Sequence, residues 1–197
     1  MQLAAGITLP FPEKIREEFQ VYEHCIRFHI SFEKIGAMLD EFLAQLQEPL
    51  FVVLQLPLSR QEEEALRMEG AETLHQKVCY LDGQTKGQVQ EILRQHGELL
   101  LNDGISQFGI ASHATHDEMF IQKYKLIDIY CGNPQAYYEF LKKYGLVRTD
   151  KLLTAWDTFS RKTPGEARSI QINGIRVYEV YDELVKQGMY EAKIIED

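Results

Sequence analysis

Residues 50–58 read LFVVLQLPL, an apolar run of strand length that Pro57 closes. An unbroken run of this kind is typical of a strand covered on both faces, and proline is disfavoured inside a central strand. The segment before it, residues 31–47, carries apolar side chains at helical spacing, which predicts an amphipathic helix that Ser31 can cap. This stretch therefore predicts a helix that leads into a buried strand.

Similar signals alternate along the rest of the chain. Strands are predicted at residues 24–30, 75–81, 98–101, 106–111, 118–122, 126–131 and 190–195. Helices are predicted at residues 12–21, 59–70, 85–96, 133–145 and 178–187. Ser59 and Thr85 begin capping boxes, and Gly70 and Gly97 are expected to end the helices that follow. Asn173-Gly174 predicts a hairpin turn, and residues 152–159 are expected to form a strand or an extended loop.

The order of these elements predicts an α+β fold. The sheet is expected to be mixed or mainly antiparallel, with helices packed mainly on one face. A chain of 197 residues with 45% hydrophobic residues can build one ample core, so a single domain over residues 1–197 is expected. The alternative is a two-lobed arrangement with a seam near residues 100–105.

The charge balance is acidic, with 30 Asp and Glu against 21 Lys and Arg and a net charge of −9. A nucleic-acid-binding protein usually carries a basic face, so that class of protein is not expected. An acidic surface suits a protein partner that is basic. Neither a GxxxxGK[ST] nor a GxGxxG phosphate loop occurs, and no cofactor is predicted.

The three cysteines, Cys25, Cys79 and Cys131, form no CxxC pair. Their odd number and wide spacing indicate neither a disulfide framework nor a structural zinc site, so buried reduced thiols are expected. The N-terminal residues lack the basic start and long apolar stretch of a signal peptide, and no apolar run is long enough to span a bilayer. A cytoplasmic protein without membrane contact is the expectation.

One polar loop gathers side chains that could carry chemistry. His113, His116, Asp117 and Glu118 lie between two predicted strands, and imidazoles with carboxylates can bind a divalent metal or move protons. The spacing argues against a helical metal motif, because that motif places its two histidines four residues apart. No metal site is assigned. An ordinary turn, a catalytic loop and a partner-binding loop all remain open.

A second group of residues could form an interface. Trp156 beside Asp157 could anchor a partner, although a core tryptophan is the alternative. Tyr138 is expected to lie partly exposed on its helix.

The acidic helix is a third candidate surface. Glu62, Glu63 and Glu64, with Glu69 and Glu72, could form a charged face for a basic partner or a merely solvated surface.

Three functions are compatible with these features. The leading hypothesis is a non-enzymatic protein-interaction or regulatory module, for example one that neutralises a partner as immunity proteins do. One alternative is a metal-assisted hydrolase that uses the loop from His113 to Glu118. The other is a small-molecule-binding domain with a tyrosine-lined pocket between the sheet and the last helix. Nothing in the sequence predicts the oligomeric state.

Overall fold

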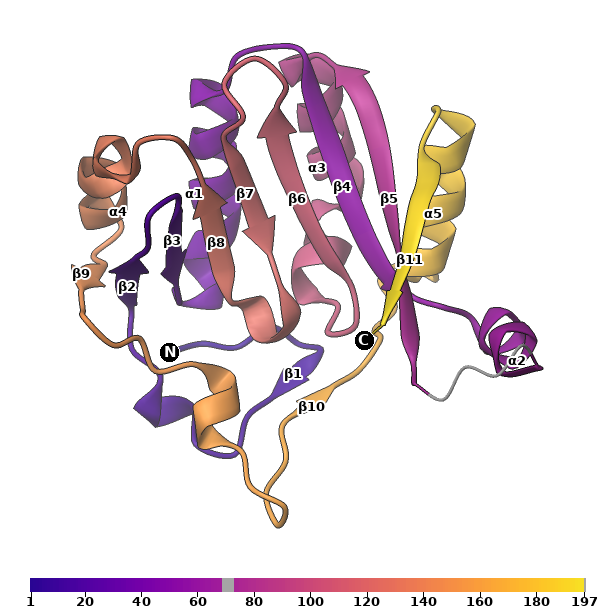
Figure 1. Cartoon of the computed structure of the whole chain (residues 1–197), viewed down its shortest axis with the longest axis horizontal. Helices are drawn as coiled ribbons and strands as arrows, with labels where there is room; N and C mark the ends of the chain where they lie inside the picture. Colours follow the sequence, from indigo (N-terminus) through magenta and orange to yellow (C-terminus); the bar gives the residue numbers. More distant parts are fainter. Residues whose placement is uncertain (69–72, 197) are drawn as a thin grey trace.

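A large sheet organises the computed structural model, which describes residues 1–68 and 73–196. Its nine strands lie in the order β11-β5-β4-β6-β7-β8-β3-β2-β9 (Figure 1). The bounds are β2 (Glu18–Val21), β3 (Cys25–Phe28), β4 (Leu50–Pro57), β5 (His75–Gln84), β6 (Gln107–Ser112), β7 (Glu118–Ile121), β8 (Ile127–Tyr130), β9 (Val147–Arg148) and β11 (Tyr190–Glu196). Only β2 and β9 are parallel among these described neighbours, so the prediction of a mixed, mainly antiparallel sheet is confirmed.

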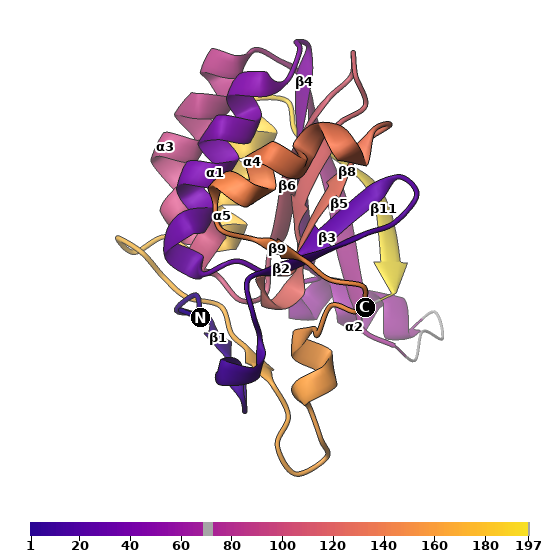
Figure 2. The ribbon, with the colours of Figure 1, turned by 90° about the vertical axis from the view of Figure 1, so that its left-hand side faces the viewer.

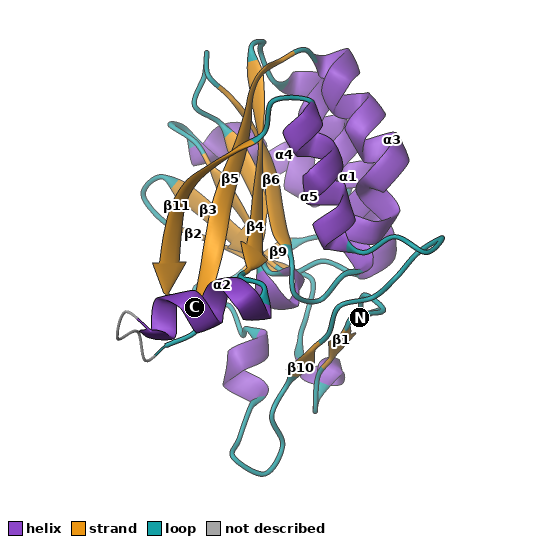
Figure 3. Ribbon diagram, turned by 90° about the vertical axis from the view of Figure 1, so that its right-hand side faces the viewer, coloured by secondary structure: helices purple, strands orange, loops and turns teal. Residues whose placement is uncertain are grey.

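The helices lie mainly on one face of this sheet, as predicted. Figures 2 and 3 show α1 (Phe32–Gln45), α3 (Lys86–Asn102) and α5 (Val177–Lys186) side by side on that face. The short helix α4 (Tyr138–Lys143) lies at the β2–β9 edge of the sheet, and α2 (Arg60–Met68) lies beyond the ends of β5 and β11. The opposite face carries no helix among the described residues.

Strand β4 shows how this arrangement divides its side chains. Leu50, Leu54 and Leu56 are buried against the helices, whereas Phe51 and Gln55 on the other face are only half-buried. No helix among the described residues covers the far face, so the predicted cover on both faces of this strand is wrong for Phe51 and Gln55, although Val53 on that face is buried. Apolar residues on the far face are shielded by neighbouring side chains, as the Phe51 ring is by His113 at 4.6 Å. A single sequence does not reveal this arrangement.

A smaller antiparallel sheet, β1 (Ile7–Thr8) with β10 (Glu166–Ala167), ties the N-terminal segment to the C-terminal third. Beside it, three backbone segments cross at Gly6, Gly104 and Arg168. The Gly104 amide donates to the Arg168 carbonyl at 3.0 Å, and the Arg168 amide donates to the Gly6 carbonyl at 2.9 Å. A Cβ atom on Gly104 would lie 2.2 Å from the Gly6 carbonyl oxygen, so only glycine fits this crossing.

The helix predicted at residues 12–21 is wrong. Only a 3-10 turn, η1 (Pro12–Lys14), forms there, and the chain then enters β2. Phe19 packs in the main core, while Ile15 belongs to a separate cluster with the N-terminal segment. The four-residue spacing of the two side chains therefore reflects two different cores and not one helical face.

Two further predictions failed for local reasons. Gly97 does not end a helix, and residues 98–101 do not form a strand, because α3 continues to Asn102 with Gly97 buried in the helix layer. Residues 152–159 hold a 3-10 turn, η4 (Ala155–Thr158), in place of a strand or extended loop.

The predicted capping boxes are confirmed at Ser59 and Thr85. Asn173 and Gly174 both have positive φ, as a hairpin turn requires, although only one bridge forms beside them. The predicted helix end at Gly70 lies outside the described residues, as do Glu69 and Glu72.

Candidate functional site

The uncovered face of the sheet presents one row of side chains across eight neighbouring strands. Side chains of a strand alternate between faces, so directly paired residues share a face. We call this surface the open face. Its central row is Gln20, Arg27, Asp128, Phe120, Gly109, Val53, Tyr80 and Tyr190. The next row adds Tyr130, Glu118 and Ala111, followed by Phe51.

Aromatic rings form a continuous line along the β11 side of the open face. Ring centroids lie 6.4 Å apart between Tyr190 and Tyr80, 5.8 Å apart between Tyr80 and Phe51, and 4.6 Å apart between Phe51 and His113. Tyr190 is 50% exposed, and Tyr130 on β8 is 39% exposed. The open face is thus rich in large, partly exposed rings, which is the composition that protein-binding surfaces favour.

Asp82 connects the polar loop that begins at His113 to this line of aromatic rings. The His113 imidazole donates from Nε2 to Asp82 Oδ1 at 2.9 Å, and the Tyr190 hydroxyl donates to Asp82 Oδ2 at 2.7 Å. The hydrogen bond to Asp82 raises the pKa of Tyr190. One carboxylate therefore fixes the first residue of the loop and the first residue of β11.

The remaining loop residues point elsewhere. His116 is exposed, with a positive φ of 61°. Asp117 bonds to Tyr137 and, after burial, contributes to raising the pKa of that phenol. Glu118 lies on the open face. Among residues 1–68 and 73–196, no three His, Cys, Asp or Glu side chains are placed to hold a metal ion.

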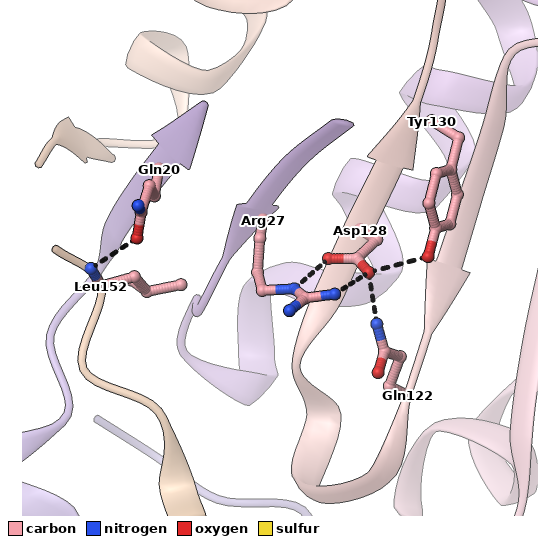
Figure 4. Close-up of polar contacts among 6 residues, drawn as sticks. All are labelled: Gln20, Arg27, Gln122, Asp128, Tyr130 and Leu152. Carbon is pink, nitrogen blue, oxygen red and sulfur yellow. Dashed lines mark hydrogen bonds and ion pairs between the residues drawn. The ribbon is translucent and has the colours of Figure 1, made fainter. Parts of the chain in front are cut away.

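A second polar cluster occupies the β3–β8 side of the open face (Figure 4). Arg27 donates from Nε and Nη2 to the two oxygens of Asp128, both at 2.8 Å. The Tyr130 hydroxyl donates to Asp128 Oδ2 at 3.0 Å, and the Gln122 amide donates to the same oxygen. Asp128 is fully buried, and hydrogen bonding to it raises the pKa of Arg27. This is a bidentate, charge-assisted pair whose acceptors are occupied.

Glu118 lies between the two clusters without a comparable partner. It faces Tyr130 on β8 and Ala111 on β6. Within the described part of the chain, no donor bonds to its carboxylate. Burial, followed by the charge of Asp128, raises the pKa of Glu118 to about 7.

A shallow hollow of about 210 Å³ lies in the middle of the open face. Its lining residues are Val53, Gln55, Val78, Tyr80, Glu118, Phe120, Tyr130, Lys193 and Ile195. Phe120 lies low over the backbone, since a Cβ atom on Gly109 would be 2.8 Å from its ring. The hollow is on the face away from α5, whereas the predicted small-molecule pocket was placed between the sheet and that helix.

The predicted interface residues are dispersed. Trp156, 43% exposed, lies beyond the strands with its ring edge-on to Tyr124 at 5.3 Å. Asp157 accepts hydrogen bonds from the Thr154 amide and hydroxyl and caps η4. Tyr138 is half-buried, with its ring 5.7 Å from that of Phe19.

The acidic helix is less available than the sequence implied. Glu62 accepts from the Ser59 amide at 2.7 Å and from Lys77 at 3.1 Å. Glu63 is buried and accepts from the His75 amide at 2.5 Å. Both carboxylates hydrogen-bond to residues of β5 and so connect α2 to that strand. Of the three glutamates, Glu64 alone is exposed.

Sequence reasoning missed Arg27, Asp128, Tyr130, Asp82 and Tyr190. In CIRFHI and in IDIY, Arg27 and Asp128 alternate with buried isoleucines. The sequence therefore indicates that both side chains lie on the face of the sheet opposite the isoleucines. That these two strands are neighbours could not be predicted, because it depends on the order of strands in the sheet.

Neither protein-family models, curated proteins nor solved structures gave a match to this chain. No helix in the described residues is both long and apolar enough to cross a membrane.

Proposed function

We propose that this chain is a protein-binding module that docks its partner on the open face. The observation that carries the proposal is the line of rings from Tyr190 through Tyr80 to Phe51 on a sheet face without helical cover in the described chain. Partly exposed tyrosines beside a bidentate arginine are the residue types that dominate binding energy at protein interfaces. A partner laid on this face would bury them.

Binding is favoured over catalysis by the state of the polar groups. The carboxylates of Asp82 and Asp128 are each held by two or more donors from this chain. Catalytic side chains would converge on one cleft, whereas these clusters lie on opposite sides of a shallow hollow. A protein that acts by occupying a partner would regulate or neutralise it, as an immunity protein does.

The charge of the chain indicates the kind of partner. The net charge of −9 favours association with a basic protein, because opposite charges steer the encounter and disfavour acidic competitors. We therefore expect the partner to carry a basic surface.

The test begins with affinity purification of tagged wild-type protein from its native cells, followed by purification of the captured partner. Isothermal calorimetry then measures the affinity for wild type, for Tyr130→Ala with Tyr190→Ala, and for Trp156→Ala. We expect the double variant to bind about tenfold or more weakly. Trp156→Ala is the matched control, because it removes an exposed ring beyond the strands, and it should bind like wild type.

Two results would contradict the proposal. One is a strictly solitary protein in its native cells. The other is a partner whose affinity depends on Trp156 and not on the two tyrosines.

A further inference from the structure

The charges on the open face leave one carboxylate without compensation. Arg27 is the cation of the neighbouring polar cluster, and both of its contacting nitrogens are engaged by Asp128 at 2.8 Å. Asp128 and Arg27 together are neutral. Glu118 therefore supplies the net negative charge at the β7 end of the hollow, and no described donor satisfies it.

Aromatic rings surround this carboxylate. Tyr130 lies directly across from Glu118 on β8, and Phe120 follows two residues later on the same face of β7. Tyr80, from β5, also lines the hollow, and burial, followed by the charge of Glu118, raises the pKa of that tyrosine. A carboxylate beside aromatic rings can attract a cation, because the charge and the rings both favour it.

We propose that the hollow at Glu118 receives an arginine or lysine side chain of the protein partner, with Tyr130 and Phe120 contacting its stem. The proposal rests on the proposed function, because the cation belongs to the protein that docks on the open face. It identifies the central contact of that interface.

Lys193 at the other end of the hollow determines the shape of the occupant. It lies on β11, four strands away from Glu118 on β7, and a strand spacing of about 4.8 Å puts the two strands roughly 19 Å apart. A small free cation can use only the Glu118 end, because Lys193 repels it at the other end, so it should bind weakly. An extended protein segment can place a basic residue at Glu118 and an acidic residue or backbone carbonyls at Lys193.

Protonation of Glu118 should weaken its contact with the partner's cation. Because the pKa of Glu118 is raised to about 7, the carboxyl is partly protonated near neutral pH, and a bound cation favours its ionised form. The other titratable or charged groups that face it are Asp128 and Tyr130 on β8, Arg27 and Cys25 on β3, Tyr80 on β5 and Lys193 on β11. Burial raises the pKa of the Cys25 thiol to about 12, so that thiol stays neutral in the range tested.

The test uses full-length protein and acetyl-arginine-amide as the probe, followed by NMR of the Glu118 carboxyl and the rings of Tyr130 and Phe120. We expect weak saturable binding that perturbs these signals. Affinity should fall about tenfold from about pH 8 to about pH 6, because the ionised fraction of a carboxyl with a pKa near 7 falls by that factor. Acetyl-norleucine-amide, which lacks the charge, should leave the signals unchanged.

Glu118→Gln should weaken binding of the arginine probe about tenfold and abolish its pH dependence. Glu64→Gln is the matched control, because it removes an exposed carboxylate of α2 and should bind as wild type does. A thermal unfolding scan of each variant shows that it is folded.

Equal binding of the arginine probe by Glu118→Gln and wild type would overturn the inference. If Tyr130→Ala with Tyr190→Ala still weakened the natural partner in that case, the proposed function would stand without this contact. If Glu118→Gln bound the arginine probe as wild type does and the double tyrosine variant also bound the natural partner as wild type does, both proposals would fail.

Discussion

Arg27 and Asp128 are 101 residues apart in the sequence and form a two-pronged ion pair across neighbouring strands, with both contacts at 2.8 Å. Asp128 is fully buried, while the Arg27 side chain is 34% exposed. The pair holds β3 against β8 and fixes the charge pattern on one side of the open face.

Removal of this arginine should destabilise the fold. Arg27→Ala leaves the Asp128 carboxylate buried without its cation, and we expect a loss of about 2 kcal/mol in the free energy of unfolding. The loss should be below that of a fully buried pair, because the guanidinium is partly exposed. Urea unfolding measures it. Arg94→Ala, which breaks an exposed pair with Glu91, is the control and should change little. Equal effects of the two variants would contradict the structural role given to Arg27.

Glu118 should lower stability at neutral and alkaline pH. The unfolded carboxyl ionises near its ordinary pKa of 4.5, whereas in the folded state burial holds the pKa at about 7. Stability therefore falls as pH rises between these two values and stays reduced above the higher one.

Glu118→Gln removes this cost, so the variant should exceed wild type by about 2 kcal/mol at alkaline pH, after allowance for partial exposure, and by little near pH 4. Urea unfolding across pH checks the difference. A gain that is the same at all pH values would contradict the raised pKa.

His29 should make the fold sensitive to acid. It is buried, its Nε2 has no hydrogen-bond partner among the described residues, and burial lowers the pKa of its imidazole from 6.5 to about 4. As pH falls, the histidine of the unfolded chain is protonated near pH 6.5, before that of the folded chain. Stability is therefore lost as pH falls from 6.5 to about 4.

The loss attributable to His29 should total about 3 kcal/mol. His29→Leu should remove that part of the acid sensitivity, measured as the difference from wild type in unfolding free energy at each pH. His24→Leu, at an exposed position, is the control and should follow wild type. If both variants kept the wild-type pH profile, His29 would not be the group responsible.

The crossing of Gly6, Gly104 and Arg168 should tolerate no side chain. Gly104→Ala would place a methyl group 2.2 Å from the Gly6 carbonyl oxygen, and we expect a loss of about 3 kcal/mol by thermal unfolding. Gly132→Ala is the matched control, because a Cβ atom there meets nothing within 4 Å. If the Gly104→Ala variant were as stable as the Gly132→Ala variant, the backbone segments at the crossing would have more space than the structure shows.

Much of the fold could be predicted from local signals. The apolar run 50–58, the alternation in CIRFHI and the capping boxes at Ser59 and Thr85 each act through nearest neighbours, so the strands and most helices follow from them. Gly97 shows the limit of such signals. Its intrinsic tendency to end a helix is outweighed where it lies buried in the helix layer and α3 continues past it.

The candidate site was less predictable. Of the predicted loop, only His113 and Glu118 belong to the open face, because Asp117 bonds to Tyr137 and His116 points to solvent. His113 contacts Asp82 on β5 and Phe51 on β4. Glu118 lies opposite Tyr130 on β8 and Ala111 on β6. Which residues lie opposite one another depends on strand order, and strand order is a property of long-range pairing that periodicity does not encode.

The most direct measurement of the central claim is hydroxyl-radical footprinting of the chain with and without its purified partner. It reports the accessibility of individual rings. The expected result is protection of Tyr130 and Tyr190 in the complex, while Trp156 stays as reactive as in the free protein. Protection of Trp156 with Tyr130 and Tyr190 unchanged would show that the partner binds elsewhere and that the open face is not the docking surface.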